Sequence, residues 1–209
     1  MASSKGRPSA YVMDFDGTLF SLPVDWKAVR RELAPLAGVP TEGVSVFKVV
    51  KEAIGIEAGL RERLFSLLDS YEIPAAEEAT PIDGALETLA RLGGQRTALV
   101  TMQGPAACRR VLTRYSAAPY FSVILTREDS LDRGAQLTMA LRAMNVAAAE
   151  VLFVGDKLSD VEAGKRTGVT VAVVGGSEKE AWGADLLIPN VAALGSSAGP
   201  WPGTLSGAP

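Results

Sequence analysis

Two aspartates near the start of the chain, Asp14 and Asp16, have the type and spacing of residues that perform chemistry. They follow the apolar run Ala-Tyr-Val-Met, and the segment continues as a Gly-Thr turn. No lysine or arginine lies between residues 8 and 26 to neutralise them. Two carboxylates that point into one crevice repel each other, and a bound divalent cation relieves that repulsion. The segment therefore predicts an acidic, metal-binding site, with Gly17 permitting the tight turn.

A second acidic pair lies far along the chain. Asp156 follows the apolar run Val-Leu-Phe-Val-Gly, and Asp160 comes four residues later, one helical turn along on the same side. Carboxylate oxygens, with waters completing an octahedron, suit Mg²⁺. The candidate cofactor is therefore Mg²⁺. The candidate metal ligands are Asp14, Asp16, Asp156 and Asp160.

The composition narrows the chemistry further. The chain has no histidine and a single cysteine, Cys108. Histidine triads, histidine zinc sites and imidazole general bases are thereby excluded. Proton transfer must use carboxylates, lysines, tyrosines or water. A catalytic cysteine usually has a basic partner, so we interpret Cys108 as a small helix residue in a protein of a reducing compartment.

The charge and the hydropathy pattern limit the partners. The net charge of −3 shows no bias towards nucleic acid or an anionic membrane. No run approaches the roughly 20 apolar residues that a membrane span needs, and the N-terminal segment is short and polar. We expect a cytoplasmic protein that has neither nucleic acid nor a membrane as its partner.

The elements that must position the aspartates alternate between strand and helix. Apolar runs of strand length alternate with helical patterns from residue 80 onwards, at 97–101, 121–125, 151–154 and 169–174. Strands without polar alternation are typical of a parallel sheet that helices cover on both faces. The predicted fold class is α/β, with a core formed by a Rossmann-like, doubly wound parallel sheet.

The segment before residue 80 has a different pattern. Apolar residues recur at helical spacing in three stretches between residues 25 and 71, with no strand among them. We expect an inserted α-helical cap at 20–79, a core formed by 1–19 and 80–194, and a flexible tail at 195–209. A helix is expected to begin at Pro81, because proline suits the first turn of a helix.

A doubly wound sheet binds ligands beyond the carboxyl ends of its strands. The residues just past those ends include both acidic pairs, Thr101 and the stretch 128–133. We expect them to surround one crevice. Several basic residues of the cap could reach a substrate there, although the solvated face of a helix is the more typical place for such residues. They are Arg30, Arg31, Lys48 and Lys51.

These motifs resemble those of the haloacid dehalogenase-like hydrolases. The resemblance rests on the signature Asp14-x-Asp16-Gly-Thr-Leu, on Thr101 after an apolar strand, and on the element Gly155-Asp156-x-x-x-Asp160, which occur in that family's order. It covers about residues 10–190, and the helical insertion resembles the small cap of the family's first cap class. Members with this layout are mostly phosphatases of small phosphorylated metabolites, such as phosphoglycolate phosphatase.

The resemblance implies a role for each acidic residue. Asp14 would be the nucleophile that attacks phosphorus, and it would also bind Mg²⁺. Asp16 would protonate the leaving oxygen and then activate the water that hydrolyses the phospho-aspartyl intermediate, while its backbone carbonyl would bind the metal. Asp156 would be a metal ligand, and Asp160 would be either a ligand or a residue that orients one.

The phosphate group needs hydrogen-bond donors and a positive charge. By the same resemblance, Thr101 and the amide of Met102 would hold phosphate oxygens. Family members usually carry a lysine before the Gly-Asp element, but the corresponding stretch of this chain contains none. We assign that charge to Arg133, which precedes a helix start where anions are favoured. Arg127 is the first competitor and Lys157 the second.

The expected function is that of a Mg²⁺-dependent phosphatase acting on a small phosphorylated metabolite. A sugar phosphomutase would use the same aspartates, and a long-lived phospho-enzyme with a bisphosphate product would indicate it. A non-catalytic binding or regulatory module of the same fold is the alternative from another class. Such a module would usually lack Asp14 or Asp16, and both are present.

Overall fold

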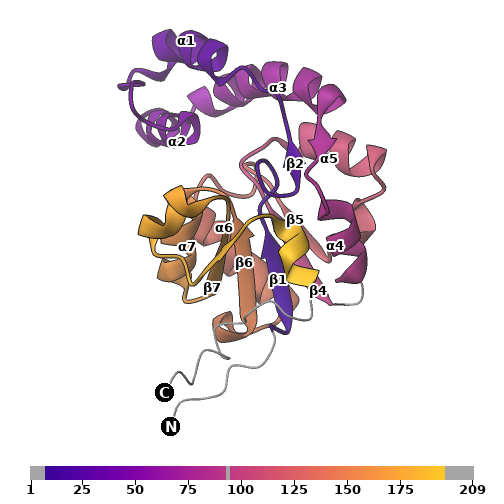
Figure 1. Ribbon diagram of the computed structural model, residues 1–209. Helices are drawn as coiled ribbons and strands as arrows, with labels where there is room; N and C mark the ends of the chain where they lie inside the picture. The colour runs from indigo at the N-terminus through magenta and orange to yellow at the C-terminus, as the bar shows by residue number, and fades with distance from the viewer. Residues whose placement is uncertain (1–7, 93–94, 196–209) are drawn as a thin grey trace.

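The computed structural model describes residues 8–92 and 95–195, which form a parallel sheet with helices around it and above it (Figure 1). Within these ranges the main sheet has six parallel strands, in the order β5 (Val123–Leu125), β4 (Arg96–Val100), β1 (Ala10–Met13), β6 (Val151–Gly155), β7 (Thr170–Val174) and β8 (Leu186–Ile188). The chain starts in the middle of the sheet, runs outwards through β4 and β5, and then returns to β6. Because the direction reverses beside β1, its carboxyl end is the expected position of a ligand crevice.

The central strand β1 is apolar along its whole length because both faces of the sheet are covered. All four of its residues are buried, and it pairs with β4 on one side and β6 on the other. Tyr11 and Met13 pack into one hydrophobic cluster, while Ala10 and Val12 pack into a second. A strand buried in this way has no polar face, which accounts for the unbroken apolar runs in the sequence.

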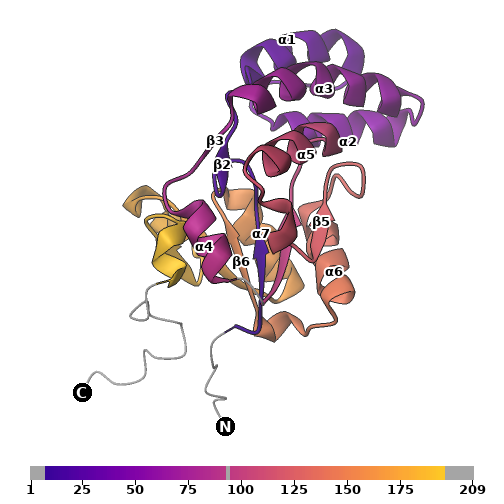
Figure 2. The ribbon, with the colours of Figure 1, turned by 90° about the vertical axis from the view of Figure 1, so that its right-hand side faces the viewer.

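Helices lie on both faces of the sheet (Figures 1 and 2). One face carries α4 (Ala85–Arg91) and α5 (Pro105–Arg114), and the other carries α6 (Arg133–Met144) and α7 (Leu158–Thr167). Short 3-10 helices occupy some of the connections: η1 (Ala118–Tyr120), η2 (Ala148–Glu150), η3 (Ser177–Trp182) and η4 (Val191–Gly195). The predicted α/β class with a doubly wound parallel sheet is confirmed.

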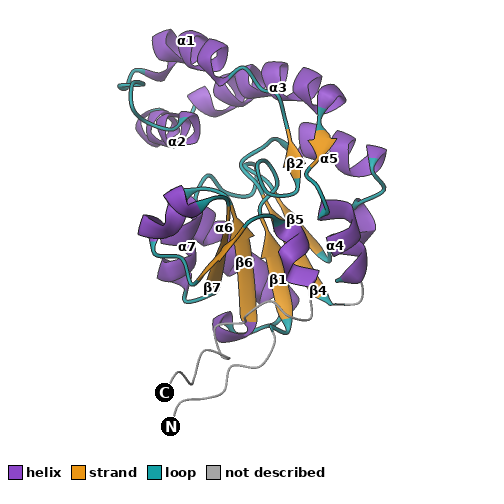
Figure 3. Ribbon diagram, viewed as in Figure 1, coloured by secondary structure: helices purple, strands orange, loops and turns teal. Residues whose placement is uncertain are grey.

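Three further helices lie over the carboxyl edge of the sheet and are here termed the cap (Figures 1 and 3). They are α1 (Trp26–Ala37), α2 (Val46–Ile56) and α3 (Leu60–Glu78). The cap joins the rest of the chain through an antiparallel ribbon of two strands, β2 (Phe20–Ser21) and β3 (Thr80–Pro81). The cap helices pack against one another, and α3 also packs against α5. The division of the chain at 19/20 and 79/80 stays a prediction.

Two helix boundaries differ from the sequence prediction, and both involve proline. The helix expected to begin at Pro81 begins at Ala85, because Pro81 belongs to β3 and Gly84 takes a left-handed conformation (φ 75°) just before the helix. The third cap helix, expected to end near residue 71, continues through Pro74 to Glu78. A proline removes one backbone hydrogen bond from a helix, so packing against the core must stabilise this last part of α3.

The predicted C-terminal tail and the apolar length of the helices can also be compared with the structure. The tail predicted at 195–209 lies outside the described residues, except for Gly195, the last residue of η4. In the part of the chain that the structure describes, every helix is too short or too polar to cross a membrane.

Candidate active site

Asp14 stands directly after β1, and the turn that follows brings it close to the end of β6. Its amide donates to the carbonyl of Val154 at 2.8 Å, and the amide of Gly17 donates to the carbonyl of Phe20 at 2.8 Å. Gly17 has a φ of 89°, and a Cβ atom there would lie 2.2 Å from Oδ2 of Asp156. Glycine is therefore required for its conformation and for the close approach of the acidic side chain.

Three carboxylates converge at this edge of the sheet. Asp14, Asp156 and Asp160 each place a carboxylate oxygen within 4.8 Å of the others. The exposed fractions of Asp14 and Asp160 are only 2% and 0%. One oxygen of each residue is buried and accepts no hydrogen bond: Oδ2 of Asp14, Oδ1 of Asp156 and Oδ1 of Asp160. Three of the four aspartates in the two sequence motifs therefore converge in the fold.

This cluster fits a hard divalent cation. Burial raises the pKa of Asp156 and of Asp160, and repulsion from the neighbouring carboxylates adds to the effect. A divalent cation beside such groups favours their ionised form. The donors are all oxygens, which is the ligand type that Mg²⁺ prefers. The buried oxygens of Asp14 and Asp156 that accept no hydrogen bond are the positions at which such a cation would be held.

Asp16 contributes differently from the three clustered carboxylates. Its Oδ1 accepts the amide of Leu22 at 3.1 Å, so the side chain lies outside the cluster. Its backbone carbonyl accepts from Nζ of Lys157 at 3.3 Å, and the same ammonium lies 3.6 Å from Oδ1 of Asp156. These two oxygens therefore already share a positive charge. Burial is the main cause of the raised pKa of the Asp16 carboxyl group.

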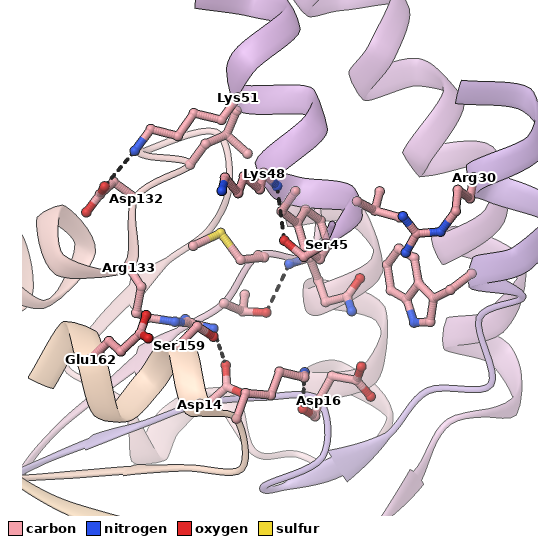
Figure 4. A pocket seen from close by; sticks show the side chains of 18 of the residues that line it. Asp14, Asp16, Arg30, Ser45, Lys48, Lys51, Asp132, Arg133, Ser159 and Glu162 are labelled. Carbon is pink, nitrogen blue, oxygen red and sulfur yellow. Dashed lines mark hydrogen bonds and ion pairs between the residues drawn. The ribbon is translucent and has the colours of Figure 1, made fainter. Parts of the chain in front are cut away.

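Arg133 is the cation that contacts Asp14 (Figure 4). As the first residue of α6, it places Nη2 2.6 Å from Oδ1 of Asp14 and Nε 3.1 Å from Oδ1 of Asp160. Its side chain is 10% exposed. Burial alone would lower the pKa of this guanidinium, but the two carboxylates outweigh burial, and the pKa is raised. Arg133 is therefore a fixed positive charge beside the predicted nucleophile.

Gln136, which the sequence analysis did not single out, supports this geometry. Its Oε1 accepts from Nη1 of Arg133 at 3.1 Å. Its Nε2 lies within 3.0 Å of the carbonyls of Thr101, Thr126 and Ser130. One buried amide thus connects the cation to the backbone of two loops. The only signal in the sequence was its place one helical turn after Arg133.

The two other candidates for the positive charge at the phosphate site, Arg127 and Lys157, do not contact Asp14. Arg127 is fully buried beneath α3, where it pairs with Glu72 and Asp69, and it does not line the pocket. Lys157 does line the pocket, but its ammonium contacts oxygens of Asp16 and Asp156 rather than Asp14. The geometry thus favours Arg133 over both.

The loop after β4 offers hydrogen-bond donors to the pocket that Asp14 and Arg133 also line. Thr101 is 1% exposed, and its Oγ1 accepts the amide of Gln103 at 3.0 Å. Because the oxygen serves as the acceptor, its own hydrogen remains available to donate. No hydrogen bond within the described ranges uses the amide of Met102. Both residues line the pocket, and their role as phosphate ligands stays a prediction.

The pocket lies between the core and the cap and has a volume of about 490 Å³ (Figure 4). Asp14 and Asp16 lie at one end of it, and side chains of α1 and α2 lie opposite. Three of the four basic cap residues named from the sequence line the pocket, namely Arg30, Lys48 and Lys51. Arg31, the fourth, does not line it. The sequence analysis did not single out Ser45, Phe47 and Ser159, which also line the pocket.

Several proteins are similar in sequence to most of this chain. An N-acetylmuramic acid 6-phosphate phosphatase of Pseudomonas putida is 26% identical, over 87% of this chain and 92% of the relative. A phosphoglycolate phosphatase of Rhodospirillum rubrum is 28% identical, over 80% of this chain and 79% of the relative. The tyrosine-protein kinase PtkA of Mycobacterium tuberculosis is 26% identical, over 83% of this chain but only 65% of the kinase.

Solved structures share the fold. One is the crystal structure of a predicted phosphatase from Clostridium acetobutylicum, with a TM-score of 0.68 and 19% identity, over 90% of this chain and 97% of that one. The model of the haloacid dehalogenase-like hydrolase family matches residues 11–174. That range contains both acidic motifs, Thr101 and Arg133, and so confirms the resemblance inferred from them. The chain belongs to the haloacid dehalogenase-like hydrolase family.

Proposed function

We propose that this protein is a Mg²⁺-dependent phosphatase that hydrolyses a small phosphorylated metabolite through a phospho-aspartyl intermediate on Asp14. One observation carries the proposal. At the end of the pocket, Oδ1 of Asp14 is held by Arg133 at 2.6 Å, while its buried Oδ2 accepts no hydrogen bond. A carboxylate oriented in this way beside a fixed cation is suited to attack a phosphate group.

In the first half-reaction, an oxygen of Asp14 forms a bond to phosphorus and the ester bond to the leaving oxygen breaks. Arg133, the hydroxyl of Thr101 and the amide of Met102 hold the phosphate oxygens. The carboxyl group of Asp16 gives its proton to the leaving oxygen. Burial raises the pKa of Asp16, which favours the protonated form that this step needs.

In the second half-reaction, the ionised Asp16 takes a proton from water, and the water oxygen forms a bond to phosphorus. The bond between phosphorus and Asp14 breaks, which releases inorganic phosphate and restores both carboxyl groups. Asp16 thus alternates between acid and base, so that no histidine is required.

Mg²⁺ would be held by Asp14, Asp156 and the backbone carbonyl of Asp16. When bound, it supplies positive charge that offsets the charge of the phosphate and of the nucleophile. Asp160 contacts Nε of Arg133 and, through Oδ2, the amide of Lys157 at 3.1 Å. We assign Asp160 the role of orienting Arg133, with direct ligation as its alternative role.

The substrate is a small phosphorylated molecule. Two of the named relatives are phosphatases of N-acetylmuramic acid 6-phosphate and of phosphoglycolate. The cavity of about 490 Å³ is of the size that encloses a small molecule. Its cap side carries lysines and an arginine, which suit an anionic substrate.

Replacement of the nucleophile tests the function directly. We expect Asp14→Asn to lower the rate of p-nitrophenyl phosphate hydrolysis with Mg²⁺ by roughly 1,000-fold or more, because an amide cannot form the phospho-enzyme. Asp83→Asn, at an exposed aspartate outside the pocket, is the control and should retain the wild-type rate. Equal rates for the Asp14→Asn variant and the wild type would contradict the proposal. A long-lived phospho-enzyme that yields a bisphosphate product would indicate a phosphomutase instead.

Metal removal tests the acidic cluster. EDTA should abolish turnover and added Mg²⁺ should restore it. Asp156→Asn should raise the Mg²⁺ concentration at half-maximal rate by roughly 10-fold or more, because the cluster loses a charged ligand. The exposed carboxylate of Glu162, which lines the same pocket, provides the matched variant Glu162→Gln, for which we expect little change. An Asp156 variant with the wild-type Mg²⁺ dependence would exclude this residue as a ligand.

Removal of the guanidinium tests the phosphate site. Arg133→Ala should lower kcat/KM for p-nitrophenyl phosphate by roughly 100- to 1,000-fold, because the charge beside Asp14 is lost. Arg133→Lys should restore part of the rate. Arg142→Ala, an exposed arginine of the same helix, controls for helix stability. Similar kinetics for the Arg133→Ala variant and the wild type would show that the phosphate is held elsewhere.

Thiol modification separates an aspartate nucleophile from a cysteine nucleophile. Cys108 is 1% exposed, and burial raises its pKa to about 12. Iodoacetamide at pH 8 should therefore leave the rate unchanged, and mass spectrometry should find Cys108 unlabelled until the protein is unfolded. Inactivation in parallel with labelling would contradict this expectation.

The free buried thiol also supports a cytoplasmic location, which forms part of the proposal.

A further inference from the structure

Charged residues of the cap converge on one loop of the core, the β5–α6 loop (residues 126–132). Lys51 of α2 places Nζ 2.6 Å from Oδ2 of Asp132. Arg61 of α3 places Nη2 3.0 Å from Oε2 of Glu128 and 2.9 Å from its carbonyl. Both pairs are exposed, and exposed pairs contribute little on their own. They show which segment of the core the charged residues of α2 and α3 contact.

The buried contact between this loop and the cap is made by Arg127. Its side chain is fully buried, and all its partners lie on α3: the carboxylates of Glu72 and Asp69, the carbonyl of Phe65 at 3.3 Å, and the ring of Phe65, whose centroid lies 5.2 Å away. Glu72 is itself 0% exposed. A buried charge cannot leave its partners without a large desolvation cost, so the loop and α3 are held in one relative position.

Arg133, the cation beside Asp14, immediately follows this loop. Oδ1 of Asp132 accepts the amide of Ala135 at 3.0 Å and so caps the helix that Arg133 begins. Within the loop, the amide of Thr126 donates to Oδ2 of Asp129 at 2.8 Å. These short-range contacts make the loop a compact unit that connects Arg127 to Arg133.

The same part of α3 also holds the β4–α5 loop (residues 101–104). Oε2 of Glu72 accepts the amide of Gly104 at 2.8 Å. A Cβ atom on Gly104 would lie 2.4 Å from Oδ1 of Asp69 and 2.6 Å from Nη2 of Arg127, so this loop lies directly against the buried charges. The backbone carbonyl of Gln103 accepts the amide of Arg127 at 3.4 Å. Both phosphate-site loops therefore meet beneath one turn of the cap.

From this geometry we propose that Arg127 is a positioning residue: by fixing the β5–α6 loop to α3, it sets the placement of Arg133 against Asp14 and the bound phosphate. Arg127 does not line the pocket, and its proposed effect on the bound phosphate is the one transmitted through Arg133. The inference rests on the proposed phosphatase function, and it adds that the cap determines the geometry of the phosphate site as well as covering it.

The test is a double-mutant cycle between the two arginines. Arg127→Met should lower kcat/KM for p-nitrophenyl phosphate about 10-fold or more and should raise the inhibition constant of inorganic phosphate similarly. In an Arg133→Ala background the same substitution should change kcat/KM less than about 2-fold, since the residue it positions is gone. Arg127→Lys keeps the positive charge but loses the guanidinium that pairs with both Asp69 and Glu72, so it should give an intermediate effect. This variant replaces Arg127→Met if the Met variant does not fold.

Glu77→Gln is the matched control, because Glu77 also joins α3 to the core, through exposed pairs with Arg110 and Arg114 of α5. It should leave the kinetics unchanged. Hydrogen exchange gives a readout independent of activity: amides of residues 126–133 should exchange faster in the Arg127 variant than in the Glu77 variant. An equal loss with and without Arg133 would overturn the inference, whereas an inactive wild-type protein would overturn the proposed function instead.

Discussion

Crowded negative charge at the carboxyl end of β1 is the constraint on which the site depends. Asp14, Asp156 and Asp160 bring carboxylate oxygens within 4.8 Å of one another, and the guanidinium of Arg133 contacts two of these residues. Buried charges of one sign are tolerated only with compensating charge. One buried oxygen of Asp14 and one of Asp156 accept no hydrogen bond, which is the arrangement that a hard cation completes.

The cap lies above the acidic cluster and also forms ion pairs with the loop that precedes Arg133. The exposed pairs formed by Lys51 and Arg61 can break at little cost, whereas Arg127 is fully buried among carboxylates of α3. The middle of α3, from Phe65 to Glu72, is therefore the fixed contact between cap and core. Because Glu72 also accepts the amide of Gly104, that fixed contact reaches both loops that flank the proposed phosphate site.

Much of the fold and part of the site could be predicted from local sequence. Unbroken apolar runs are a direct consequence of strands covered on both faces, so the doubly wound sheet could be inferred from them. Because such a sheet binds ligands at its carboxyl edge, the aspartates after two of its strands were expected to converge; the side chains of Asp14, Asp156 and Asp160 do so, whereas that of Asp16 lies outside the cluster. The choice of Arg133 followed from a similar local argument, its place at a helix start.

Tertiary structure decided what local sequence does not encode. Arg127 and Arg133 are both arginines of one short stretch, and only the packing of α3 separates the buried one from the one beside Asp14. Gln136 and Glu72 gave no motif, because their partners lie on other loops of the chain. The sequence by itself determined the strands, the acidic motifs and the family. The fold decided which charges neutralise one another, since electrostatic pairing depends on distances in space and on burial, neither of which residue spacing specifies.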